Sequence, residues 1–278
     1  MNTRRSFLKT GTAGALAKAG PRRRPIFDAH LHCPSADGQV WQWHRVTRDF
    51  DDFVVYLART GVERGVINNV RSQDAKDAAG FIAGNREVAR LAEKHKGRLQ
   101  PACIVNPPYI DESLREMEEC RKQLGMLWIA ELCNYVTPYE YSIKQFALLV
   151  EQAIRLRMVL HLHTEGDEMH YIMKKFPAAT GPVCAPRRRQ GIRACLPAHR
   201  PGGSTSKLLS GYRHDRVGVL EYAVQQIGPD RILFGSDFSI NDPGSVIARI
   251  DNALITPEQK KKILWRNLEA LLAKVGAQ

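Results

Sequence analysis

Two histidines near the start of the chain have the spacing of a paired metal site. His30 and His32 end an apolar run that begins at residues 25–27. In a β-strand, residues two apart point to the same side, so both imidazoles could reach one metal ion at the end of the strand. Imidazole is a frequent ligand of catalytic zinc and related ions. The alternative is a pair of histidines on an edge strand that only face solvent. Other motifs in the chain are needed to distinguish the two interpretations.

Other apolar runs also end in residues that can bind a metal or move a proton. A single Asp after an apolar run is usually a turn or helix-capping residue. Histidine or acid at four strand ends together is difficult to attribute to chance. These residues are His30 and His32, Glu131, His161 and His163, and Asp237.

Short apolar runs alternate with amphipathic segments from residue 25 onward, which is the pattern of β-α units. Strands are expected at 25–32, 63–70, 98–105, 126–132, 157–163 and 230–237, and helices at 49–60, 82–96, 110–124, 143–156, 166–176, 215–227 and 257–274. Fully apolar strands indicate a parallel sheet. Six or more such units favour an α/β fold of the closed (β/α)8 TIM-like type, whose chemistry lies at the C-terminal strand ends. The chain contains no GxGxxG or GxxxxGKS stretch, which argues against nucleotide-binding folds.

Charge and composition limit the classes of partner. The chain has 278 residues and a net charge of +12, but residues 1–24 and 176–213 each hold seven bases and no acid. Removing these fourteen bases leaves −2 for the remainder, which argues against a nucleic-acid-binding face. No apolar run approaches the ~20 residues that span a bilayer. The six cysteines lack CxxC spacing, and Cys33, Cys103 and Cys133 are expected to be small buried hydrophobic residues.

The N-terminus has the form of an export signal. Thr3-Arg4-Arg5-Ser6-Phe7-Leu8-Lys9 matches a twin-arginine motif, small residues follow at 10–17, and Ala15-Leu16-Ala17 could be a cleavage site. This predicts export of the folded protein to the periplasm by the twin-arginine machinery. The alternative is a chance basic N-terminus on a cytoplasmic protein. We therefore treat residues 1–24 as an extension and residues 25–278 as the barrel domain.

Together these motifs resemble the amidohydrolase superfamily, in the amidohydrolase-related branch that includes aminocarboxymuconate-semialdehyde decarboxylase. The matching pieces are Phe27-Asp28-Ala29-His30-Leu31-His32, Ile129-Ala130-Glu131-Leu132, His161-Leu162-His163-Thr164 and Ile232-Leu233-Phe234-Gly235-Ser236-Asp237-Phe238. The resemblance implies a divalent metal ion, most often zinc, with His30, His32, His163 and Asp237 as ligands. It leaves Glu131 as a further ligand, a hydrogen-bond partner of a bound group, or a structural acid. His161 shares the face of His163, so either could be the ligand.

The reaction that the resemblance favours is hydrolysis of a small amide, ester or lactone by metal-activated water. Asp237 and His163 would be the catalytic residues, with Asp237 passing the water proton to the leaving group. Trp41, Trp43 and His44 could line the substrate pocket or form a packed lid. The alternatives are non-oxidative decarboxylation of a small carboxylic acid and a degenerate, non-catalytic barrel. Relatives often form homodimers, and no stable membrane insertion is expected.

Residues 177–210 depart from the family pattern. Strand six should end here in a His followed by Gly-Gly, but this chain has Pro186 followed by three arginines, and His199 lies in a Pro/Gly-rich stretch. Pro-Arg-Arg-Arg-Gln-Gly can be encoded by one choice of codons, CCA CGT CGG CGG CAA GGC, and the same bases read one base later give His-Val-Gly-Gly-Lys. We therefore hypothesise that residues 185–208 are read out of frame; the alternative is a divergent basic loop. Residues 177–210 therefore give poor support for a sixth strand that ends in a histidine. This is the basis for the alternative of a non-catalytic barrel.

Overall fold

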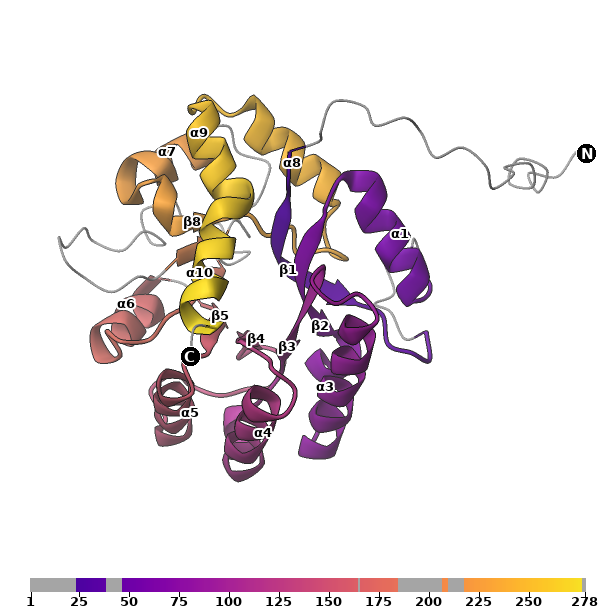
Figure 1. Cartoon of the computed structure of the whole chain (residues 1–278). Coiled ribbons are helices and arrows are strands. Elements are labelled where there is room, and N and C mark those ends of the chain that lie inside the picture. Colours follow the sequence, from indigo (N-terminus) through magenta and orange to yellow (C-terminus); the bar gives the residue numbers. More distant parts are fainter. Residues whose placement is uncertain (1–23, 39–46, 165, 185–206, 210–217, 277–278) are drawn as a thin grey trace, which may run out of the picture.

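Eight parallel strands form the centre of the molecule. The computed structural model describes residues 24–38, 47–164, 166–184, 207–209 and 218–276. The strands are β1 (Phe27–Cys33), β2 (Arg64–Asn69), β3 (Leu99–Cys103), β4 (Trp128–Cys133), β5 (Val159–His163), β6 (Pro182–Cys184), β7 (Lys207–Leu209) and β8 (Ile232–Leu233). Each strand pairs with the next in chain order, and helices lie around the outside of the strands (Figure 1). The predicted (β/α)8 barrel is confirmed.

The barrel closes where the last strand meets the first. The Ala29 N–H donates to the Phe234 carbonyl at 2.9 Å, and the Asp237 N–H donates to the His30 carbonyl at 3.0 Å. The chain directly after β8 therefore continues along β1. This contact brings Asp237 to the same end of the barrel as the first-strand histidines.

Several of the helices begin where a side chain accepts a hydrogen bond from one of their free N–H groups. The helices are α1 (Phe50–Thr60), α2 (Val70–Gln73), α3 (Ala78–Glu93), α4 (Ile110–Lys122), α5 (Lys144–Arg155), α6 (Gly166–Lys175), α7 (Val219–Ile227), α8 (Pro243–Asn252), α9 (Pro257–Lys261) and α10 (Asn267–Gly276), with a π-helical turn between the last two. Asp49 caps α1, and Asp77 caps α3, which begins at Ala78, four residues before the predicted start at 82. Sequence reasoning missed α8, which Asp242 caps and Pro243 begins.

Large apolar side chains from strands and helices fill the space between them. Trp128, Phe53, Phe81, Phe146 and Phe234 are all fully buried. Burial of a side chain of this size contributes about 1.5–3 kcal/mol, so these residues hold the strands in fixed positions. Cys33, Cys103 and Cys133 are buried as predicted.

Helices α2 and α3 pack closely against each other. A Cβ atom added to Gly84 in α3 would lie 2.6 Å from the Ser72 hydroxyl oxygen in α2. Only glycine allows this approach, which holds α2 at the C-terminal end of β2.

The short strand β6 corrects one expectation. Although strand six was poorly supported by the sequence, Val183 pairs with Leu162 of β5 and with Leu208 of β7. The strand lies before the arginine triplet, not within it. Gly181 makes it fit, because a Cβ atom there would lie 1.7 Å from the Leu160 carbonyl oxygen.

Several predictions concern parts of the chain outside the described ranges. These are the export motif within residues 1–23, the three pocket residues Trp41, Trp43 and His44, and residues 185–206 with Pro186 and His199. Arg24, which ends the predicted extension, forms an ion pair with Asp251. Among the described helices, none is long and apolar enough to cross a bilayer.

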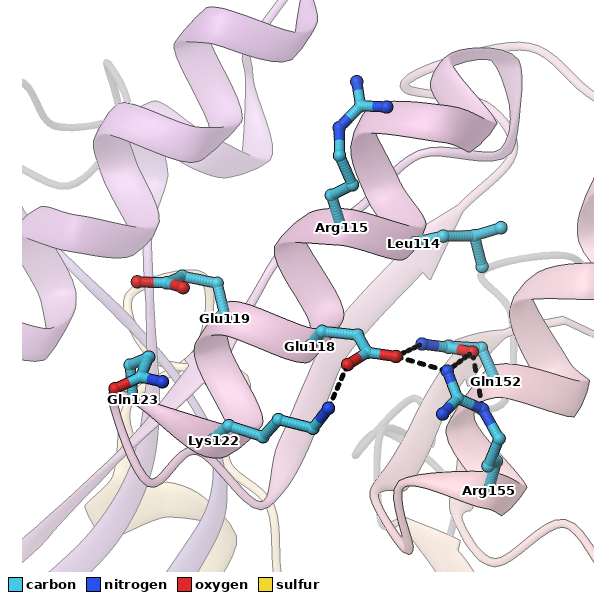
Figure 2. Close-up of a pocket in the computed structure, with 8 residues that line it drawn as sticks. All are labelled: Leu114, Arg115, Glu118, Glu119, Lys122, Gln123, Gln152 and Arg155. Carbon is cyan, nitrogen blue, oxygen red and sulfur yellow. Dashed lines mark hydrogen bonds and ion pairs between the residues drawn. The ribbon is translucent and has the colours of Figure 1, made fainter.

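A groove on the outer surface lies between α4 and α5 (Figure 2). Glu118 is at its centre and pairs with Lys122 and Arg155, and the Gln152 amide donates to Glu118 at 3.2 Å. The hydrogen bonds from Lys122 and then Arg155 lower the pKa of Glu118 to about 2. The charges of Glu118, Lys122 and Arg155 therefore satisfy one another.

Candidate metal centre

Three side chains at the ends of β1 and β4 converge on one point. His30, His32 and Glu131 offer ligand atoms that all lie within 4.8 Å of one another. Their side chains are only 4%, 1% and 6% exposed. Two imidazoles and a carboxylate in a dry site form a donor set that suits a divalent cation. The residues present therefore fit the metal ion that the sequence predicts.

His32 is held in place by a residue that sequence reasoning did not select. Its Nδ1 lies 2.6 Å from the Asn68 side-chain oxygen. The two residues are also opposite each other in the β1–β2 ladder. Because the amide oxygen accepts, Nδ1 carries the proton, and the Nε2 lone pair is available to a metal. The sequence signal was a polar pair, Asn68-Asn69, directly after the apolar residues Val66 and Ile67 at the end of the strand.

Asp237 follows β8, and its side chain approaches the same two histidines from the segment that pairs with β1. Its Oδ1 lies 3.1 Å from His32 Nε2 and 3.6 Å from His30 Nε2. Its backbone has a φ of +59°, which is uncommon for any residue except glycine. At 21% exposure its side chain is more accessible than the two histidines. Asp237 can therefore contact both the buried donor set and solvent.

The two histidines of β5 lie in different surroundings. His163, at the strand end, places Nδ1 2.6 Å from Glu131 Oε1 and is 18% exposed. His161 is buried beneath it, with its ring centroid 4.5 Å from that of His30. Tyr135 lies edge-on to the His163 ring at a centroid distance of 5.0 Å. The structure thus brings His163 to Glu131 at the mouth of the barrel and leaves His161 in the layer below.

Neighbouring carboxylates and burial shift the pKa values of His30, His161 and His163 in different directions. Burial opposes the charged form of His30, but Glu131 and Asp237 together raise its pKa to about 9. Against the same burial effect, Glu131 raises the pKa of His163. Burial, followed by the neighbouring His30, holds the pKa of His161 well below its usual range. The donor cluster therefore attracts positive charge, which is what a divalent cation would supply.

The Asp28 carboxylate links the backbone of β1 to the backbone of the segment after β8. Its Oδ1 accepts from the His30 N–H at 2.9 Å and from the Ser236 N–H at 3.0 Å. Burial raises the pKa of this carboxyl to about 6. Asp28 connects the two backbone segments that carry His30 and Asp237, a role that its place in the sequence motif did not reveal.

Comparison with known proteins supports the resemblance inferred from the strand ends. Residues 163–273 match the family described as Amidohydrolase, which confirms the amidohydrolase resemblance. No curated protein is a significant match to the chain. Its fold is shared by many solved structures.

Three of these structures show how far the similarity extends. An uncharacterised TIM-barrel protein from Bordetella bronchiseptica has a TM-score of 0.71 at 19% identity, over 91% of this chain and 99% of that one. A 5-carboxyvanillate decarboxylase from Novosphingobium aromaticivorans, complexed with manganese and 4-hydroxy-3-methoxy-5-nitrobenzoic acid, has a TM-score of 0.69 at 13% identity, over 96% and 100%. A 2,6-dihydroxybenzoate decarboxylase from Rhizobium has a TM-score of 0.65 at 15% identity, over 91% and 99%. At such identities the comparison establishes a shared barrel.

Proposed function

We propose that this chain, which has the strand-end motifs and the barrel of the amidohydrolase superfamily, is a metal-dependent decarboxylase of a small hydroxylated aromatic acid. The observation that carries the proposal is the convergence of His30, His32 and Glu131 within 4.8 Å, with Asp237 beside them. Two of the similar structures described above are decarboxylases of such acids, which favours decarboxylation over the hydrolysis that the sequence first suggested.

The chain's own residues can perform the proton transfer that decarboxylation requires. A divalent cation bound by His30, His32 and Glu131 would supply Lewis-acid attraction for the substrate carboxylate and an adjacent hydroxyl. Asp237, in its acid form, donates a proton to the ring carbon that bears the carboxylate. The bond between that carbon and the carboxylate then breaks, its electron pair returns to the ring, and CO2 leaves. Asp237 regains a proton from water, to which its side chain is partly exposed.

The test is product analysis on the metal-loaded protein. Purified chain is supplied with manganese or with zinc and incubated with a panel of hydroxybenzoates, and CO2 release is measured. Asp237→Asn should abolish CO2 release, because the amide cannot deliver the proton. Asp230→Asn is the matched control, since Asp230 is exposed, pairs with Lys262, and lies before β8 and not at its C-terminal end. Absence of CO2 from every acid in the panel would refute the proposal.

Hydrolysis of an amide, ester or lactone is the second candidate. It is favoured by the position of Asp237, whose carboxylate could accept a proton from a water molecule beside the two histidines. A hydrolase would form a new carboxylate from a lactone, ester or amide panel without releasing CO2. A protein that does neither, although it holds metal, would fit the non-catalytic reading. Metal titration of the same protein would decide whether zinc or manganese is preferred.

We also propose export through the twin-arginine pathway. The support is the motif that contains Arg4 and Arg5. Changing both residues to lysine should retain the protein in the cytoplasm, and fractionation of cells would measure this.

Size-exclusion chromatography with light scattering would test the expected homodimer. Re-sequencing the gene across residues 177–212 would test the frame hypothesis, because a restored frame should encode His-Val-Gly-Gly-Lys.

A further inference from the structure

We propose that Tyr56 of α1 is a positioning residue for Asp237. Its ring and its hydroxyl hold the two ends of the turn that follows Asp237, so that the carboxylate stays beside His32. The inference rests on the proposed role of Asp237 in proton transfer. It concerns a side chain outside the donor cluster that sequence reasoning did not select.

Asp237 has a backbone conformation that its surroundings must maintain. Its φ of +59° is one that residues other than glycine adopt infrequently, and such conformations persist where neighbouring groups enforce them. The placement also matters for chemistry, because a displacement of about 1 Å at a reacting group can lower the rate roughly 100-fold. The groups that hold the turn after Asp237 should therefore affect the rate of proton transfer.

The turn after Asp237 is closed by hydrogen bonds within itself. The N–H groups of Ile240 and Asn241 donate to the Asp237 carbonyl at 2.7 Å and 3.2 Å. The side-chain amide of Asn241 also donates to the Ser236 carbonyl at 3.2 Å. We therefore expect the turn to move as a unit, so that a contact at either end affects the Asp237 side chain.

Tyr56 contacts the near end of this turn through its ring. That ring is nearly parallel to the ring of Phe238, the residue directly after Asp237, with centroids 4.9 Å apart and 4° between the planes. Phe53, one helical turn earlier on α1, stacks on Phe238 at a centroid distance of 5.7 Å. Phe238 is 2% exposed. Two rings of α1 therefore fix Phe238 and, through one peptide unit, the backbone of Asp237.

Tyr56 contacts the far end of the same turn through its hydroxyl. This hydroxyl donates to Oδ2 of Asp242, and a hydrogen bond to a carboxylate is stronger than one between neutral groups. The other oxygen of Asp242, Oδ1, accepts from the Ser245 N–H at 2.9 Å and caps α8. Helices α1 and α8 lie side by side (Figure 1). One side chain of α1 therefore spans the turn from Phe238 to the start of α8.

Variants at Tyr56 can separate positioning from general support of the fold. Tyr56→Leu removes both contacts, and Tyr56→Phe keeps the ring but removes the hydroxyl. Tyr109→Leu is the matched control, because Tyr109 is also partly buried, packs against Phe81 at a centroid distance of 6.3 Å and donates its hydroxyl to the Lys76 carbonyl. Tyr109 thus joins the connections that follow β2 and β3.

Four quantities are measured on the metal-loaded full chain: the kinetics of CO2 release, metal affinity, thermal unfolding, and amide hydrogen exchange of residues 236–241 by mass spectrometry. Tyr56→Leu should lower kcat about 10- to 100-fold and speed exchange, while KM and metal affinity stay within about twofold of wild type, because the donor cluster is not part of the turn. Tyr56→Phe should retain most of kcat. Tyr109→Leu should keep wild-type kcat and exchange, even where its unfolding temperature falls as far.

Hydrogen exchange keeps this inference separate from the reaction. If wild type releases no CO2, the decarboxylase is refuted, but faster exchange of residues 236–241 in Tyr56→Leu and not in Tyr109→Leu still supports the positioning role. Unchanged exchange in Tyr56→Leu would overturn the inference whatever the reaction, and so would wild-type kcat in this variant or an equal fall of kcat in Tyr109→Leu. If Tyr56→Leu does not fold, Tyr56→Met replaces it, since its flexible side chain fills more of the space without a ring.

Discussion

Replacing Asn68 with alanine tests whether the residues behind the metal ligands determine metal affinity. The substitution removes the oxygen that lies 2.6 Å from His32 Nδ1. Both residues are almost completely buried, so water has little access to replace that oxygen. Loss of a buried hydrogen-bond partner costs about 1–3 kcal/mol of folding free energy. Loss of the group that orients a metal-binding histidine weakens metal binding roughly 10- to 100-fold, which is about 1.4–2.7 kcal/mol.

The measurement is competition for Zn²⁺ between the protein and a chromophoric chelator, together with urea unfolding of the metal-free protein. Asn68→Asp should bind the metal at least as tightly as wild type, because a carboxylate also accepts from Nδ1 and makes the imidazole more basic. Asn252→Ala is the control. Asn252 is exposed, and its side-chain amide donates a hydrogen bond to the Ala248 carbonyl within α8, away from the metal ligands. Equal zinc affinity in wild type and a folded Asn68→Ala would refute the reasoning.

Three further substitutions test the packing and the charges. Arg86→Ala leaves the carboxylate of Glu116, which is 3% exposed, without its bidentate partner. Urea unfolding should show a loss of about 3 kcal/mol in the free energy of unfolding. An unchanged unfolding midpoint would contradict this. Gly84→Ala places a Cβ 2.6 Å from a hydroxyl of α2, and thermal unfolding should show a loss of about 1–3 kcal/mol. Glu118→Gln removes a carboxyl whose pKa is lowered to about 2, chiefly by its hydrogen bond with Lys122. The ionised Glu118 carboxylate therefore stabilises the fold at pH values above its ordinary pKa of 4.5, and this stabilisation is lost as the pH falls toward 2. Wild type should therefore lose stability more steeply than Glu118→Gln across that acid range, and parallel curves at low salt would show that the pairing contributes nothing.

Much of the fold could be predicted because most of its strands are rich in apolar residues. In β4 and β5 every residue except Glu131, His161 and His163 is apolar, so the positions of these strands followed directly. Helix α8 was missed although Asp242-Pro243 is a capping signal, because only Val246, Ile247 and Ile250 mark its apolar face. Strand six was judged weak because Pro186 and three arginines stand where the strand was expected to end. The feature that lets β6 pack is a close contact of Gly181 with β5, which depends on the three-dimensional fold.

The site could be predicted in part for a related reason. His30, His32 and Asp237 follow apolar strands, and a closed barrel must bring such strand ends together. The supporting residues could not be found this way. Asn68 acts through its register with His32, and the Asp28 carboxylate acts by accepting a hydrogen bond from the Ser236 N–H. Both depend on pairings between strands, which no single stretch of sequence records.

The closure of the barrel also constrains how the site can be assembled during synthesis. His32 and Asp237 meet across 205 residues of chain. A ribosome must therefore complete most of the protein before the last carboxylate can reach the first two histidines. Contacts this distant in sequence form late, after more local β-α units have collapsed. A nascent or truncated chain that lacks the final strand would have an open barrel and would lack Asp237 beside the donor set, so the proton transfer proposed for Asp237 requires the completed fold.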